Sequence, residues 1–291
     1  MYTGFTIERP TQLDEALEIL EEGGDATRPL GGGSGLTLLM RYGFFEPETL
    51  VSLDRLDGLS GIERASDGAL HLGALNTLRD LEDSHRVAQH VPVLRAALRG
   101  LATVRLRNVA QLGGAIAHGH PQMDLPPVLL ALGAQVRVRS RGGERWIDAD
   151  ELFLGYYETA IGDDELLTDV VIPDQGRHRA VYRKVTARTA DDWPMLGVAV
   201  VAREGERGPD VRIAVGAVTD RAQRLHQTEA AIGDGAPTAD AIRTIAEEAA
   251  ASLDHHDGAS GTATYQRHRL AVELRRALSA TLLDGTDTEG R

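Results

Sequence analysis

Four glycines and one serine fill residues 31–35, directly after the short segment 28–30 and directly before an apolar run. Successive glycines let neighbouring backbone N–H groups turn toward one point, and the lack of Cβ atoms lets an anion approach them closely. The same residues can also form a simple tight turn. Taken alone, this first loop leaves both interpretations open.

Spacing excludes three familiar uses of such a loop. A dinucleotide fingerprint starting at Gly31 or Gly33 would need glycine where the chain has Leu36 or Leu38. A phosphate-binding loop of the Walker type needs a lysine, and the only lysine of the chain is Lys184. A nucleophile elbow around Ser34 would also need glycine at position 36. Spacing therefore gives no support for Ser34 as a catalytic nucleophile.

A second glycine loop lies about 80 residues further on, at residues 111–116. It places Gly113 and Gly114 beside the small residues Ala115 and Ala117, which again permits a close backbone approach to a ligand. Two such loops fit a large cofactor with a pyrophosphate in its middle, and FAD is a molecule of that kind. The single lysine, in a chain that otherwise uses arginine, marks a position where a compact ammonium group is favoured.

Hydrophobic patterns divide the chain into three predicted domains, 1–57, 58–175 and 176–291. The first is a βαβ unit whose helix, capped by Thr11, turns Leu13, Leu17 and Leu20 to one face. The second alternates strands and helices and includes a helix with Asp124 near its N-cap. The third has three antiparallel strands followed by two amphipathic helices, and residues 284–291 look like a loose tail.

Composition narrows the class of protein further. A formal net charge of −13 argues against a nucleic-acid-binding surface. No apolar run approaches the roughly 20 residues that span a bilayer, and the start of the chain has no secretory signal pattern. With no cysteine, the chain holds no disulfide and no iron–sulfur cluster. The absence of cysteine also fits a cytoplasmic protein. His118 and His120 lack an evident third ligand, so we predict no metal site.

Both loops, together with the segments around them, resemble one known family. The stretches "RPLGGGSGLTLLMRYG" and "VAQLGGAIAHGHPQMD" are similar to the two FAD loops of the FAD-binding medium subunit of molybdenum hydroxylases. This family contains carbon monoxide dehydrogenase and xanthine dehydrogenase. The stretch "YRKVTARTADDWPML" resembles the start of its C-terminal domain, and the likeness runs over nearly the whole chain.

The resemblance implies an α+β fold: a two-part FAD-binding domain of the vanillyl-alcohol-oxidase/PCMH type, then a C-terminal α+β domain with a three-stranded antiparallel sheet and helices. It also implies a set of FAD-binding residues. Carried over position by position, these are Leu30, Gly31, Gly32, Gly33, Ser34, Gly35, Leu36, Gln111, Gly113, Gly114, Ala115, Ile116, Asp124, Leu167 and Lys184.

Three positions depart from the family pattern. Gln111 stands where a hydroxyl residue is usual, Ala115 where a polar residue such as asparagine is usual, and Gly35 where an acidic residue or serine is usual. Each lost hydrogen bond costs about 1 kcal/mol, which the backbone contacts of a large cofactor can offset.

The function implied by the resemblance is electron transfer through FAD, with no catalytic residue in this chain. By resemblance, a large subunit with a molybdenum cofactor and a small subunit with two [2Fe–2S] clusters are the partners, in a dimer of heterotrimers. The flavin would receive electrons from the clusters and reduce an external acceptor. Two alternatives stay open: a self-contained flavin oxidoreductase, and a degenerate homologue that acts as a non-enzymatic scaffold.

Overall fold

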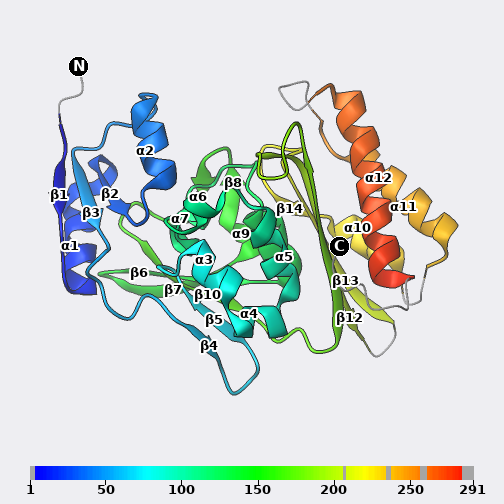
Figure 1. The fold of residues 1–291 in the computed structure, drawn as a ribbon, viewed down its shortest axis with the longest axis horizontal. Helices are drawn as coiled ribbons and strands as arrows, with labels where there is room; N and C mark the ends of the chain where they lie inside the picture. The colour runs from blue at the N-terminus through cyan, green and yellow to red at the C-terminus, as the bar shows by residue number, and fades with distance from the viewer. Residues whose placement is uncertain (1–3, 206–207, 234–236, 256–260, 284–291) are drawn as a thin grey trace. The chain divides into compact units, whose positions relative to one another are not determined.

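The computed structural model of the chain describes residues 4–205, 208–233, 237–255 and 261–283 (Figure 1). The predicted tail at 284–291 lies outside these residues. The chain divides into two compact units. The first unit contains residues 1–89, 102–119 and 134–173, and the second contains residues 90–101, 120–133 and 174–291. Within the described residues, no helix combines the length and the apolar character needed to cross a membrane.

A three-stranded parallel sheet opens the first unit, with the strand order β1-β3-β2. Its elements are β1 (Thr6–Glu8), α1 (Leu13–Gly23), η1 (Gly24–Ala26), β2 (Thr27–Leu30), α2 (Ser34–Arg41) and β3 (Thr49–Ser52). The side chains of Leu17 and Leu20 on α1 are buried against this sheet, as their spacing predicts. The predicted cap is wrong by one residue: Gln12 is the N-cap, and the Thr11 N–H group donates to the Glu15 carboxylate instead.

A five-stranded antiparallel sheet with the order β4-β5-β10-β6-β7 forms the rest of the first unit's framework. Its strands are β4 (Ile62–Arg64), β5 (Leu70–Gly73), β6 (Gln135–Ser140), β7 (Gly143–Asp148) and β10 (Leu166–Ile172). Short elements surround it: α3 (Leu78–Asp83), α4 (His85–His90), α6 (Val104–Arg107), α7 (Leu112–Ala117), α9 (Ala149–Leu152), β8 (Phe153–Gly155) and β9 (Glu158–Thr159).

The second unit is built on an antiparallel sheet with the order β11-β12-β13-β14. Its elements are α5 (Pro92–Gly100), α8 (Leu125–Leu132), β11 (His178–Thr186), β12 (Pro194–Glu204), β13 (Pro209–Gly216), β14 (Gln223–Arg224), α10 (His226–Ile232), α11 (Ala239–Ser252) and α12 (Ala263–Leu282). The prediction of a three-stranded sheet is corrected to four strands. The sequence gives no sign of β14, because two residues are too few to show an apolar alternation.

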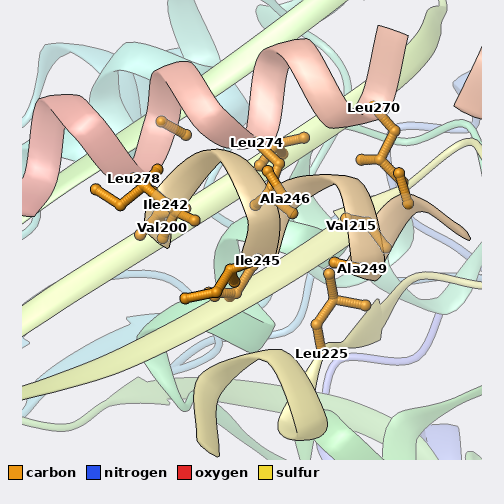
Figure 2. Close-up of a cluster of buried hydrophobic side chains, with 14 of the residues drawn as sticks. Val200, Val215, Leu225, Ile242, Ile245, Ala246, Ala249, Leu270, Leu274 and Leu278 are labelled. Atoms are coloured by element: carbon orange, nitrogen blue, oxygen red, sulfur yellow. The ribbon is translucent and has the colours of Figure 1, made fainter. Parts of the chain in front are cut away.

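The two faces of this sheet carry different partners. Val200 and Val215 lie in a cluster with Ile242 of α11 and with Leu274 and Leu278 of α12, which confirms the predicted helical faces (Figure 2). Helices α5 and α8 pack against the same sheet. Successive side chains of a strand point to opposite faces, so β11 presents different residues to α5 and to α12.

Candidate cofactor site

Glycine residues 31–33 connect β2 directly to α2, which starts at Ser34. Gly33 is the N-cap of α2 and has a left-handed φ of 70°, a conformation that favours glycine. Within the described residues, no group accepts a hydrogen bond from the backbone N–H groups of residues 31–36. A run of six N–H groups at the start of a helix is suited to binding an anion.

Backbone hydrogen bonds fix the second loop to the strand end at Gly73. The N–H group of Leu112 donates to Asn76 O at 3.0 Å, and that of Gly113 donates to Ala74 O at 2.8 Å. Gly113 is also required sterically, because a Cβ atom there would lie 2.8 Å from the Cβ of Ala74. The next N–H group, that of Gly114, has no acceptor within the described residues.

The two loops touch each other within the first unit. A Cβ atom on Gly32 would lie 1.8 Å from the carbonyl oxygen of Val109, so Gly32 lets the loops meet. A Cβ atom on Gly31 would lie 2.2 Å from Oε1 of Gln111. That oxygen is buried and has no hydrogen-bond partner within the described residues. A Cβ atom on Gly114, in contrast, would meet nothing within 4 Å.

These features fit a large anionic cofactor such as FAD. The N–H groups supply hydrogen-bond donors, and the glycines leave the backbone accessible. The side-chain oxygen of Gln111 has no hydrogen-bond donor within the described residues, and a ligand can supply one. The side-chain oxygen of Gln111 therefore has unused hydrogen-bonding capacity next to Gly31.

Other predicted site residues in the first unit are buried. Ala115 is 9% exposed and Ile116 is fully buried, so their side chains belong to the core of this unit. Leu167 is 5% exposed and lies in β10 at a register shift of the ladder with β6. Because these apolar side chains pack into the protein, only the backbone of these residues has polar groups to offer a ligand.

Asp124 and Lys184 come together in the second unit. Lys184 Nζ lies 3.1 Å from Asp124 Oδ2 and donates to the carbonyl oxygen of Gly100 at 2.8 Å. The hydroxyl of Tyr182 donates to Asp124 Oδ1 at 2.8 Å. Asp124 is the N-cap of α8, as predicted, but its side chain makes no capping bond because Tyr182 and Lys184 hold it.

Burial is the largest influence on the pKa values of Asp124 and Tyr182. It raises the pKa of Asp124, while the Lys184 ammonium and the Tyr182 hydrogen bond oppose that rise. Burial also raises the pKa of Tyr182 well above its usual value, and the negative charge of Asp124 adds to this effect. Tyr182 is therefore a neutral donor over the physiological pH range.

Sequence reasoning missed three contributors: Tyr182, the carbonyl of Gly100 and the carbonyl of Val109. Tyr182 lies two residues before Lys184, so strand alternation could have placed both on one face. The two carbonyls carry no side-chain signal. The chain also shows no group of three or more metal-binding side chains within the described residues.

Residues 3–175 match the family described as the FAD binding domain in molybdopterin dehydrogenase. Residues 166–281 match the family described as the CO dehydrogenase flavoprotein C-terminal domain. The chain therefore belongs to the family of FAD-binding medium subunits of molybdenum hydroxylases, as its two loops indicate.

Particular relatives span the same length. The chain is 34% identical to the nicotine 6-hydroxylase medium subunit of Paenarthrobacter nicotinovorans, over 91% of this chain and 92% of that protein. It is 32% identical to the carbon monoxide dehydrogenase medium chain of Hydrogenophaga pseudoflava, over 95% and 96%. A solved structure of the carbon monoxide dehydrogenase from Hydrogenophaga pseudoflava superposes with a TM-score of 0.92 at 30% identity, covering 97% of this chain and 98% of that one.

Proposed function

We propose that the two glycine loops of the first unit bind the FAD of an electron-transfer subunit. The observation that carries this proposal is the run of backbone N–H groups at residues 31–36. No group in the described residues accepts a hydrogen bond from them. The N–H group of Gly114 and the side chains of Ser34 and Gln111 extend the same surface. The buried Gln111 oxygen accepts a hydrogen bond from the cofactor, which replaces the partner it lacks within the described residues.

The chemistry belongs to the cofactor: FAD, when bound, accepts electrons and passes them on. The protein's own residues position it, neutralise its charge and exclude water, and none of them acts as a substrate acid or base. The electrons come from [2Fe–2S] clusters in a small partner subunit, which a large molybdenum subunit supplies, and they leave to an external acceptor. The proposed assembly is a dimer of heterotrimers in the cytoplasm.

Asp124 and Lys184 are proposed to bind the cofactor as well, with Leu167 contributing its backbone. An ammonium group has three N–H donors, and the two bonds that Lys184 makes leave one for a ligand oxygen. Asp124 accepts one bond at each oxygen and can accept a second from a ribose hydroxyl. In this role Asp124 also keeps the ammonium of Lys184 in place.

Domain boundaries at residues 57 and 175 accompany this proposal. The two family matches, which end at residue 175 and begin at residue 166, support the second boundary. The division between 1–57 and 58–175 stays a prediction.

Reconstitution of the apo chain with FAD tests the cofactor assignment. Gly114→Leu is expected to abolish flavin retention and leave the fold intact, because a Cβ atom at this position would meet no atom of the described residues within 4 Å. Gly142→Leu is the matched control: this glycine lies in the turn before β7, where the nearest atom to a new Cβ is 3.5 Å away. Equal flavin content in both variants would contradict the site.

Co-purification tests the assembly. If the chain is an electron-transfer subunit, purification from its native source is expected to give a yellow protein that contains molybdenum and iron in stoichiometric amounts. A chain that oxidises a small substrate without partners would support the self-contained flavin enzyme instead. A colourless chain that cannot take up FAD would support the scaffold.

A further inference from the structure

His118 lies beside the first glycine loop, although it follows the second glycine loop in the sequence. It is the C-cap of α7: its N–H group donates to the carbonyl oxygen of Gly114 at 3.1 Å, and the N–H group of Gly119 donates to that of Ile116 at 3.2 Å. A Cβ atom on Gly35 would lie 3.1 Å from His118 Nδ1 and 3.2 Å from Cε1. The imidazole thus occupies the space that a side chain at position 35 would fill. It adjoins the N–H groups that are proposed to bind the diphosphate.

The hairpin between β8 and β9 supports the imidazole from another side. The ring of Tyr157 meets the ring of His118 edge-on, with centroids 5.0 Å apart. Tyr157 has a left-handed φ of 60°, a conformation that residues with a Cβ rarely adopt. Its N–H group donates to the carbonyl oxygen of Gly119 at 3.0 Å, which ties the hairpin to the residue after His118. Strained backbone held in this way is typical of functional sites.

We propose that His118 is a further cofactor-binding residue, and that its imidazole takes up a proton from solvent when the FAD diphosphate binds to residues 31–36. This inference rests on the proposed function of the two loops. The proton adds to a ring nitrogen and forms an imidazolium ion, and no bond of the cofactor changes. The resulting positive charge lies next to the bound phosphates and stabilises them.

The charges around the ring favour this change. Burial lowers the pKa of His118, so the ring is neutral at neutral pH before the cofactor binds. Residues 31–40 and the residues of α7 include no titratable side chain. The hairpin contributes the titratable side chains of Tyr156, Tyr157 and Glu158. Burial raises the pKa of Tyr157. The carboxylate of Glu158 lies near Gly155.

A diphosphate bound to residues 31–36 would bring negative charge next to this ring. An anion nearby favours the charged form of histidine, so the pKa of His118 is higher with FAD bound than without it. Between these two pKa values, binding takes up a proton, and the affinity for FAD rises as the pH falls.

Calorimetric titration of FAD into the full-length apo chain measures this proton directly. The titration is done near pH 6.5 in two buffers that differ in ionisation enthalpy. The wild-type chain is expected to take up a substantial fraction of one proton for each FAD bound. His118→Gln keeps an N–H donor but cannot gain a charge, so it is expected to take up none. His85→Gln, which alters an exposed histidine of α4, is the matched control and should behave as the wild type.

Two outcomes overturn the proposal: no proton uptake by the wild type, or equal uptake by the wild type and His118→Gln. If His118→Gln binds no FAD, the pH dependence of the wild-type dissociation constant decides. A dissociation constant that does not change between about pH 5.5 and 8 then overturns the proposal. A dissociation constant that decreases as the pH is lowered, by up to about tenfold per pH unit, supports it.

The same experiments distinguish a failure of the proposed role of His118 from a failure of the proposed FAD site. Retention of FAD by Gly114→Leu would show that the cofactor site itself is wrong. Loss of FAD in that variant, with no proton uptake in the wild type, would leave the site in place and reject only the role of His118.

Discussion

Tyr182 donates a hydrogen bond of 2.8 Å to Oδ1 of Asp124, the carboxylate oxygen that Lys184 does not contact. The two strand residues therefore hold one carboxylate at both of its oxygens, from the same face of β11. Gly197 on the neighbouring strand makes room for this arrangement, because a Cβ atom there would lie 2.8 Å from the Tyr182 hydroxyl.

Removal of that hydroxyl is the first prediction. Tyr182→Phe leaves Oδ1 of a buried carboxylate without its donor, which is expected to lower the free energy of unfolding by about 1–3 kcal/mol. Urea denaturation of the apo chain measures the change. Tyr265→Phe removes a hydroxyl from a residue that is 46% exposed, and this control should change stability by less than about 0.5 kcal/mol. Equal stability of the two variants would remove the energetic role of the Tyr182 bond.

Protonation of Asp124 gives the second prediction. A carboxyl whose pKa is raised by folding adds stability below its unfolded value, and this stability is lost as the pH rises through the folded pKa. Asp124→Asn does not titrate there. The unfolding free energy of the wild type minus that of the Asp124→Asn variant is therefore expected to increase as the pH is lowered from about 7 to 4.

Urea denaturation of the apo chain at several pH values tests this sign. Asp57→Asn, which removes an exposed carboxylate, is the control and is measured over the same pH range. A difference for Asp124→Asn that decreases toward acid pH would mean that folding lowers the pKa of Asp124.

Hydrophobic patterns in the sequence were sufficient to predict most of the helices and strands, and runs of consecutive glycines were sufficient to find both glycine loops. The faces of α11 and α12 follow from apolar residues at helical spacing, and Ile242, Ala246 and Leu274 are buried as that spacing requires. Contacts between distant segments were beyond such patterns. No spacing rule reveals that the carbonyl of Val109 lies where a Cβ of Gly32 would be, because the fold alone brings these residues together.

The reason for each glycine could not be read from the sequence either. Gly31, Gly32 and Gly114 look equivalent as members of glycine loops. In the structure a Cβ on Gly32 would meet backbone, one on Gly31 a flexible side chain, and one on Gly114 open space. Only the last position is free to report on a ligand without disturbing the protein.

That difference yields the third prediction. Gly32→Ala puts a Cβ 1.8 Å from a backbone oxygen, so the loops must separate, at an expected cost of about 1–3 kcal/mol in the unfolding free energy of the apo chain. Gly31→Ala is the comparison, because the end of the Gln111 side chain can turn away, and it should cost less. Denaturation without FAD measures both. A Gly31→Ala variant as unstable as Gly32→Ala would show that Gln111 is held rigidly.

The last prediction concerns the junction of sheet and helix in the second unit. Glu273 of α12 has a side chain that is 3% exposed, and it pairs with Arg183 of β11 at 2.5 Å, Arg269 at 3.2 Å and Arg276 at 3.0 Å. Removal of one partner from a buried ion pair costs about 3–5 kcal/mol, since the remaining charges lose their compensation. These arginines are partly exposed, so Glu273→Ala is expected to lower the unfolding free energy by about 2–4 kcal/mol.

Glu248→Ala provides the control on the neighbouring helix α11, where the glutamate is exposed and makes no ion pair within the described residues. It should change stability by less than about 0.5 kcal/mol. Glu273→Gln separates charge from packing: it keeps the volume and the acceptor oxygen, so it should lie between the wild type and Glu273→Ala. If Glu273→Gln is as stable as the wild type, the carboxylate charge does not hold α12 to β11, and the hydrogen-bonding oxygen alone is sufficient.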